Sequence, residues 1–145
     1  MPVRPEYRHL YATEEWQRLR ERALQRAQYQ CQGCLKPDRT PVLTRTGDGC
    51  MFWRTLDRRM WFNDSGWPCS IEDYECLVDL PQRRILVVLS VCHADGIPEN
   101  MNDGNLRVWC QWHHLKNDLA QHRSTRCERK DAERPLLTLV AGAVA

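Results

Sequence analysis

Four apolar residues recur at helical spacing near the start of the chain: Trp16, Leu19, Ala23 and Ala27. Thr13 can cap the first turn of a helix there, and Glu14 and Glu15 place negative charge at the end that favours it. The pattern predicts a helix over about Glu14–Gln28. Its arginine-rich stretch, residues 18–26, fits either a solvated face or contacts with phosphates.

The clearest strand is Ile85–Val91, which is rich in β-branched residues. A polar loop over 95–105 follows it, and Leu106–Trp109 fits a second short strand or an extended lead-in. From Gln111 the pattern predicts a helix to roughly Arg123. The expected order in this half of the chain is strand, loop, short strand and helix.

Residues 42–80 fit more than one structure. Val42–Thr44 fits a short strand, and Gly47–Gly49 and Asn63–Gly66 have the composition of turns. A hairpin and a long decorated loop both fit this pattern. The segment also holds three tryptophans: Trp53, Trp61 and Trp67. They suit stacking on bases, but tryptophans in a small domain are more often core.

Length and composition narrow the class of protein. The 145 residues fit one domain, and 42% hydrophobic with 28% charged residues argues against wholesale disorder. No run approaches the roughly 18 apolar residues of a membrane span, and the N-terminus lacks the apolar core of a signal peptide. We therefore expect a cytoplasmic protein with no membrane partner. The formal net charge is +2, with mildly basic ends and an acidic middle, which permits a polyanion partner.

Eight cysteines in a chain without an export signal indicate thiols or metal ligands rather than disulfides. Cys31 and Cys34 lie three positions apart, with Gly33 allowing a tight turn, and Cys110 and His113 form a second such pair. Three cysteines and one histidine form a common closed zinc site. The spacing predicts one structural zinc ion, and free buried cysteines beside a surface histidine are the alternative.

Three more polar residues lie around the predicted strands: His93, where the first strand ends, Asn105 and His114. His114 directly follows His113, and neighbours on a helix point about 100° apart, so the two can face different sites. Asp118 lies one turn after His114 on the same face. His114 and Asp118 can therefore hold a second, open metal site, with His93 approaching from the strand.

These residues carry a family resemblance. The stretch from Val91-Cys-His-Ala-Asp-Gly through Asn100 to Asn105-Leu-Arg-Val-Trp-Cys-Gln-Trp-His-His114 resembles the HNH endonuclease pattern, especially small phage and prophage members. The likeness covers Cys31–Cys34 and about Ile85–Asp118. It implies an α+β fold: a ββα-metal (His-Me finger) core with an N-terminal helix and a structural zinc knuckle.

The resemblance implies one nuclease domain over residues 1–145. Its parts would be the N-terminal helix and first zinc knuckle (1–41), an acidic, tryptophan-rich insert (42–84), the ββα-metal core (85–123) and a C-terminal tail (124–145). Residue by residue, His93 matches the general base that deprotonates the attacking water. Asn105 matches the residue that fixes the loop and helps to orient that histidine, and His114 matches a ligand of the catalytic divalent ion. The structural zinc ligands are matched by Cys31, Cys34, Cys110 and His113.

Two positions depart from the family's pattern. His113 stands where the family usually has cysteine, and zinc accepts either residue. Cys92 precedes the base, where many members place an Asp or His metal ligand. The catalytic metal then rests on His114 with Asp118, Asp95 or Cys92, although Cys92 also fits a small buried hydrophobe.

The expected function is a DNA endonuclease that uses Mg²⁺, Mn²⁺ or Ni²⁺ in a bacterial or phage-infected cell. Two alternatives stay open. One is a zinc-stabilised DNA-binding module of the same fold that has lost catalysis through Cys92. The other is a zinc-knuckle interaction protein that assists phage packaging or assembly.

Overall fold

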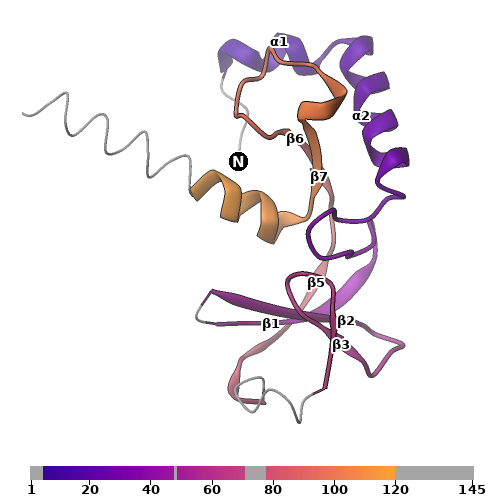
Figure 1. Cartoon of the computed structure of the whole chain (residues 1–145), viewed down its shortest axis with the longest axis vertical. Coiled ribbons are helices and arrows are strands. Elements are labelled where there is room, and N and C mark those ends of the chain that lie inside the picture. The colour runs from indigo at the N-terminus through magenta and orange to yellow at the C-terminus, as the bar shows by residue number, and fades with distance from the viewer. Residues whose placement is uncertain (1–4, 48, 71–77, 120–145) are drawn as a thin grey trace, which may run out of the picture. The chain divides into compact units, whose positions relative to one another are not determined.

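A computed structural model of the chain describes residues 5–47, 49–70 and 78–119. Two compact units divide the chain, Met1–His114 and Leu115–Ala145. The first unit begins with a short 3-10 helix, η1 (Pro5–Tyr7), followed by α1 (Arg8–Tyr11) and α2 (Glu14–Arg26) (Figure 1). The mixture of helices and strands confirms the α+β class.

Helix α2 forms where the apolar spacing predicted it. The Thr13 hydroxyl accepts a hydrogen bond from the Trp16 N–H at 3.1 Å, which caps the first turn. Trp16, Ala23 and Leu24 are buried. The helix ends at Arg26, two residues before the predicted end, because Gln28 and Tyr29 take the left-handed conformation, with φ of 53° and 52°.

The predicted insert folds into an antiparallel sheet with the strand order β4-β3-β2-β1-β5. Its strands are β1 (Pro41–Gly47), β2 (Cys50–Thr55), β3 (Trp61–Phe62), β4 (Pro68–Cys69) and β5 (Gln82–Leu86). Gly47 pairs with Cys50, and Gly49 has a φ of +80°, so β1 and β2 form a tight hairpin at the predicted turn. Of the two interpretations of 42–80, the hairpin is confirmed.

Apolar side chains of β2 lie on both faces of this sheet. Met51 and Trp53 belong to the main hydrophobic cluster with α2, while Phe52 packs with Trp61 in a second cluster on the other side. Because Met51, Phe52 and Trp53 are all buried, β2 is a continuous apolar run and lacks the alternation of a strand with one solvated face. Trp67, in contrast, is 70% exposed.

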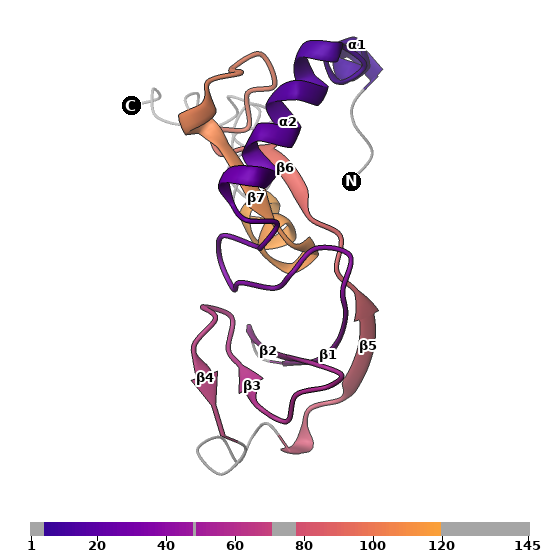
Figure 2. The ribbon, with the colours of Figure 1, turned by 90° about the vertical axis from the view of Figure 1, so that its right-hand side faces the viewer.

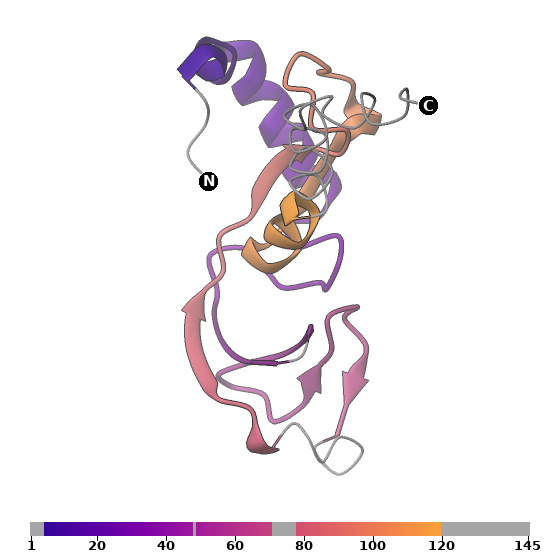
Figure 3. The ribbon, with the colours of Figure 1, turned by 90° about the vertical axis from the view of Figure 1, so that its left-hand side faces the viewer.

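The single strand predicted over Ile85–Val91 is wrong. Strand β5 ends at Leu86, and a separate strand β6 (Ser90–His93) begins four residues later in another sheet. Figure 2 shows β5 running on into β6, and Figure 3 shows the same passage from the opposite side. Between them the Val87 N–H donates to the Thr40 carbonyl at 3.0 Å, and the Leu89 N–H donates to the Asp38 carboxylate at 2.9 Å. Val87 and Leu89 of this run are buried in the core, whereas Leu86 and Val88 are 53% and 40% exposed.

The second sheet is the antiparallel pair of β6 and β7 (Leu106–Trp109), in which His93 lies opposite Leu106. The strand predicted at Leu106–Trp109 is thus confirmed. A 3-10 helix, η2 (Asp103–Asn105), precedes β7, and residues 111–119 are helical. The expected continuation to Arg123 lies outside the described residues. No helix of the described ranges is long and apolar enough to cross a membrane.

Candidate metal centre and the His93 loop

The two predicted half-sites come together in one cluster. The ligand atoms of Cys31, Cys34, Cys110 and His113 all lie within 4.8 Å of one another. The Sγ atoms of Cys34 and Cys110 are 3.7 Å apart, and His113 Nδ1 lies 3.6 Å from Cys31 Sγ and 3.5 Å from Cys110 Sγ. A tetrahedral zinc site with bonds of about 2.3 Å to sulfur and about 2.0 Å to nitrogen has edges of about 3.8 and 3.5 Å. The cluster can therefore hold a metal ion such as zinc.

The cluster stands at the junction of the first knuckle with β7. The Gln32 N–H donates to the Val108 carbonyl at 2.9 Å, and the Val108 N–H donates to the Gln32 side-chain oxygen at 2.9 Å. The Cys110 N–H points at Cys31 Sγ at 3.3 Å. These bonds place the first ligand pair, Cys31 and Cys34, beside the second pair, Cys110 and His113, which directly follows β7.

The electrostatics of the cluster favour a thiolate. Hydrogen bonds from the Cys110 and Cys34 thiols lower the pKa of Cys31 well below its usual range. The bonds that Cys34 shares with Cys110 and Cys31, together with burial, raise the pKa of Cys34. Contacts with Cys110 and Cys31 raise the pKa of His113 to about 9. Zinc binds the thiolate form of cysteine and the neutral form of histidine, so metal binding at this cluster would release protons from its ligands.

Gly33 has a role that the sequence did not indicate. A Cβ atom at this position would lie 2.5 Å from Cδ2 and Nε2 of the His113 ring. The predicted tight turn is therefore only part of the explanation, because glycine also leaves the space that the imidazole occupies.

His93 lies at the end of β6 and is 7% exposed. Its ring stacks on Trp16, with the ring centroids 5.5 Å apart and the planes at 23°, and Tyr11 packs edge-on at 6.2 Å. Burial lowers the pKa of His93, while the carboxylates of Asp95 and Glu99 oppose that effect. The side chain is accordingly a neutral imidazole near pH 7, and its Nε2 has no hydrogen-bond partner among the residues that the structure describes.

Asn105 ties together the loop that follows His93. Its amide nitrogen donates to Asp95 Oδ1 and to the Asn100 carbonyl, both at 3.0 Å, and its own carbonyl accepts from the Ala94 N–H at 2.8 Å. The loop-fixing contacts expected of Asn105 are therefore present, while its effect on the orientation of His93 stays a prediction. Hydrogen bonds from the Ile97 N–H and the Asn100 amide lower the pKa of Asp95.

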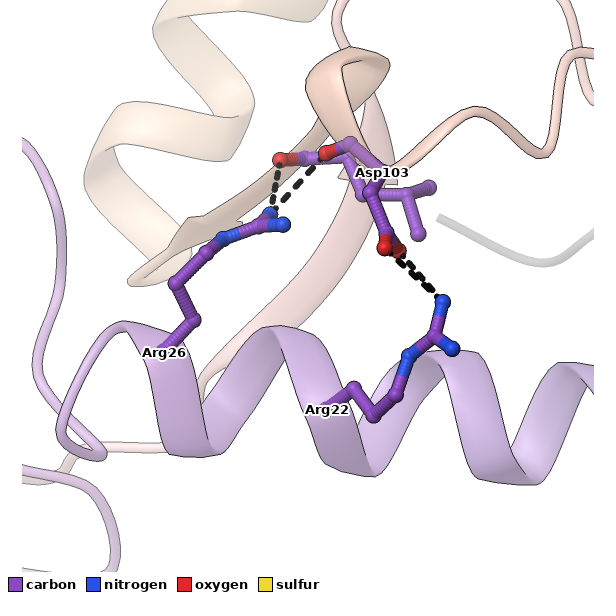
Figure 4. Close-up of polar contacts among 4 residues, drawn as sticks. Arg22, Arg26 and Asp103 are labelled. Atoms are coloured by element: carbon purple, nitrogen blue, oxygen red, sulfur yellow. Dashed lines mark hydrogen bonds and ion pairs between the residues drawn. The ribbon is translucent and has the colours of Figure 1, made fainter.

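Helix α2 holds the far end of the same loop (Figure 4). Arg22 Nη2 lies 3.0 and 2.8 Å from the two carboxylate oxygens of Asp103, and Arg26 Nη2 donates to the Asp103 carbonyl at 3.0 Å and to the Leu106 carbonyl at 3.2 Å. Both arginines are exposed, as a solvated face predicts, while contacts with phosphates stay a prediction. The two arginines bind another part of the chain.

The ligands predicted for a second, catalytic metal lie on β6, on the loop after it and on the helix over 111–119. Cys92 Sγ donates to the Arg107 carbonyl at 3.5 Å, across the β6–β7 pair. His114 is half-buried on the helix over 111–119, and Asp118 lies on that helix in the second unit. Among the described residues of the first unit, Cys92, Asp95 and His114 are not part of any group of three or more ligands like the cysteine–histidine cluster.

No sequence motif pointed to Trp16, Arg22 or Arg26 as neighbours of the candidate site. Helical periodicity placed Trp16 on the buried face, but it did not indicate what that face covers. Comparison with protein-family models, curated proteins and solved structures finds no match for this chain.

Proposed function

We propose that the protein is a divalent-metal-dependent DNA endonuclease in which His93 is the general base. The observation that carries this proposal is the order of parts in the segment from β6 to residue 114. The strand ends in a buried, neutral imidazole, Asn105 braces the loop behind it, and β7 leads into the cysteine–histidine cluster and then His114. This order supports the arrangement that the HNH resemblance implies.

The chemistry fits the residues. Hydrolysis of a phosphodiester needs a base that is neutral near physiological pH and accepts a proton from water, which imidazole supplies. A divalent cation bound by His114 would offset the charge that develops on the phosphate. Trp16 restricts the plane of the His93 ring, so little reorientation would precede proton transfer.

We infer that the cluster of Cys31, Cys34, Cys110 and His113 binds a structural zinc ion. Four protein ligands at tetrahedral distances fill the coordination sphere of zinc, whereas catalytic zinc sites keep one position open for water or substrate. The metal would therefore stabilise the fold, and hydrolysis would take place elsewhere.

One observation favours the alternative of an inactive DNA-binding module. Cys92 takes the position of a family metal ligand, and its thiol is hydrogen-bonded to the Arg107 carbonyl. A cysteine thiol is a poorer ligand for Mg²⁺ than a carboxylate is, since Mg²⁺ prefers oxygen ligands. The two proposed functions differ in nuclease activity, but both include a structural zinc ion and DNA as the partner.

Plasmid nicking separates them. The purified protein is incubated with supercoiled plasmid and Mg²⁺, Mn²⁺ or Ni²⁺, beside the His93→Ala variant and the matched control His9→Ala, an exposed histidine in α1. We expect nicking that His9→Ala retains and that His93→Ala lowers by about 100-fold or more, the usual contribution of a general base. Zinc content and melting temperature of each variant check that it is folded.

Metal-dependent nicking that His93→Ala retains would show that His93 is not the base. No nicking with any of the three ions, from protein that holds one zinc per chain and binds DNA, would favour the binding module.

A further inference from the structure

A pocket of about 530 Å³ lies between the first knuckle and the five-stranded sheet. The knuckle side includes Leu35, and the sheet side includes Trp53 and Phe62. The residues that follow β2, Leu56, Asp57 and Arg58, also line it. Its volume falls within the range of small-molecule sites in proteins.

The wall of the pocket is aromatic. The rings of Trp53 and Phe62 stack with their centroids 4.9 Å apart and their planes at 26°. Trp53 is buried, and its indole nitrogen has no hydrogen-bond partner among the residues that the structure describes. The indole nitrogen itself is closed to solvent, so an occupant would contact this pair through the ring surface that lines the pocket.

Two large apolar side chains that line the pocket are about half exposed to solvent. Leu35 is 50% exposed and Leu56 is 43% exposed. Leu35 also has a φ of 62°, a left-handed conformation that leucine rarely adopts. The bond from its N–H to the Cys31 carbonyl, at 2.8 Å, holds it there. Unusual backbone geometry of this kind gathers at binding sites.

Charged groups accompany the apolar ones. Asp57 and Arg58 are both exposed and both line the pocket, which therefore offers an acceptor and a cation beside an aromatic wall. An apolar peptide side chain would use neither of these groups. A nucleobase has flat apolar faces, donors and acceptors around its edge, and a phosphate next to it.

We propose that this pocket binds one unstacked nucleobase of a single-stranded DNA segment, with Arg58 on the adjacent phosphate. The inference rests on the proposed function for its choice of DNA as the partner. Leu35 and Leu56 contact the base, and the exposed Asp57 carboxylate is available to its edge. Single-stranded nucleic acids are commonly held by this combination of aromatic surface and positive charge.

The test measures binding of a fluorescein-labelled deoxycytidine octamer to the full-length, zinc-loaded protein by fluorescence anisotropy, with no other divalent metal added. An octamer of abasic sites has the same charge and no bases. Two variants carry the test, Arg58→Ala and Leu56→Ala. Their matched controls, Arg59→Ala and Met60→Ala, change exposed residues of the same loop that do not line the pocket.

We expect the abasic octamer to bind about tenfold or more weakly than the cytidine octamer, since stacking of one base commonly contributes that much. Arg58→Ala and Leu56→Ala should each weaken binding of the cytidine octamer several-fold, and their controls should match wild type. In ¹H–¹⁵N spectra the indole N–H resonance of Trp53, assigned with Trp53→Phe, should move with the cytidine octamer and stay in place with the abasic one.

Equal binding of the two octamers, or equal effects of Arg58→Ala and Arg59→Ala, would overturn the proposal and leave contacts to phosphate alone. No binding of either octamer would also overturn it and would favour an apolar peptide as the occupant. Failure of the nuclease proposal looks different, because base binding would persist in a protein that nicks no plasmid.

Discussion

At the scale of single residues, Gly33 is the position where one added carbon should matter most. A Cβ there would lie 2.5 Å from the His113 ring, and that ring cannot retreat without leaving the ligand cluster. We expect Gly33→Ala to weaken zinc binding by roughly 10- to 100-fold, the range seen when ligand orientation is disturbed. Competition with a chromogenic chelator measures this.

Gly104→Ala is the matched control for that substitution. Nothing lies within 4 Å of the Cβ that it would add, and Gly104 is also in the first unit. Its zinc affinity should equal that of wild type. If Gly33→Ala also bound zinc as wild type does, the proposed packing of the His113 ring against Gly33 would be wrong.

At the scale of elements, α2 holds the loop between β6 and β7 at two places. Trp16 stacks on His93 at its start, and Arg22 and Arg26 bind residues Asp103 and Leu106 at its end. Removing both arginines should therefore loosen the loop and leave the zinc cluster intact. For the double variant Arg22→Ala/Arg26→Ala we expect amide hydrogen exchange at Ala94 to rise roughly fivefold, since one hydrogen bond is worth about 1 kcal/mol net.

Arg18→Ala is the control for this experiment, because Arg18 pairs with Glu14 of its own helix at 3.1 Å and with no other side chain among the residues that the structure describes. It should leave exchange at Ala94 unchanged. Unchanged exchange in the double variant would mean that the Asn105 contacts alone hold the loop.

Elements were predictable where local signals agreed with the tertiary structure. The cap at Thr13 and the apolar spacing after it are local features, and α2 follows them. The stretch from Ile85 to Val91 was predicted to be one strand because its residues are apolar and β-branched. Such a run does not indicate which strand is its partner, and so it does not show where one sheet ends and another begins. Here Leu86 ends one sheet, and the bond from the Leu89 N–H to Asp38, 51 residues away, starts the turn toward the other.

At the scale of the whole molecule, the metal cluster was the most predictable part of the site. Each ligand pair has a fixed spacing and needs only a tight local turn. The pairs could therefore be recognised in the sequence although 76 positions separate Cys34 from Cys110. The surroundings of His93 depend on where α2 packs, which no local pattern contains. The same holds for the pocket beside Trp53, since its two walls come from segments that lie apart in sequence.

The prediction that belongs to this scale is the effect of removing the metal. The cluster joins the start of the chain to its second sheet, and its cysteines are buried at 0%, 0% and 1% exposure for Cys31, Cys34 and Cys110. Without a metal, the thiols would be left buried with only weak hydrogen bonds, and the two segments would lose their strongest link. Structural zinc sites contribute about 10–16 kcal/mol to folding in small domains, so even part of that would lower the melting temperature by more than about 10 °C.

Circular dichroism melts before and after treatment with 1,10-phenanthroline measure this loss, and added Zn²⁺ should restore the original transition while Mg²⁺ should not. Cys34→Ser should lower the melting temperature as chelation does, whereas Cys50→Ser, at an exposed cysteine outside the cluster, should leave it unchanged. A transition insensitive both to chelation and to Cys34→Ser would contradict a structural metal. A fall on chelation that Mg²⁺ reverses would assign the stabilisation to an oxygen-rich site, because thiolate and imidazole ligands select zinc over magnesium.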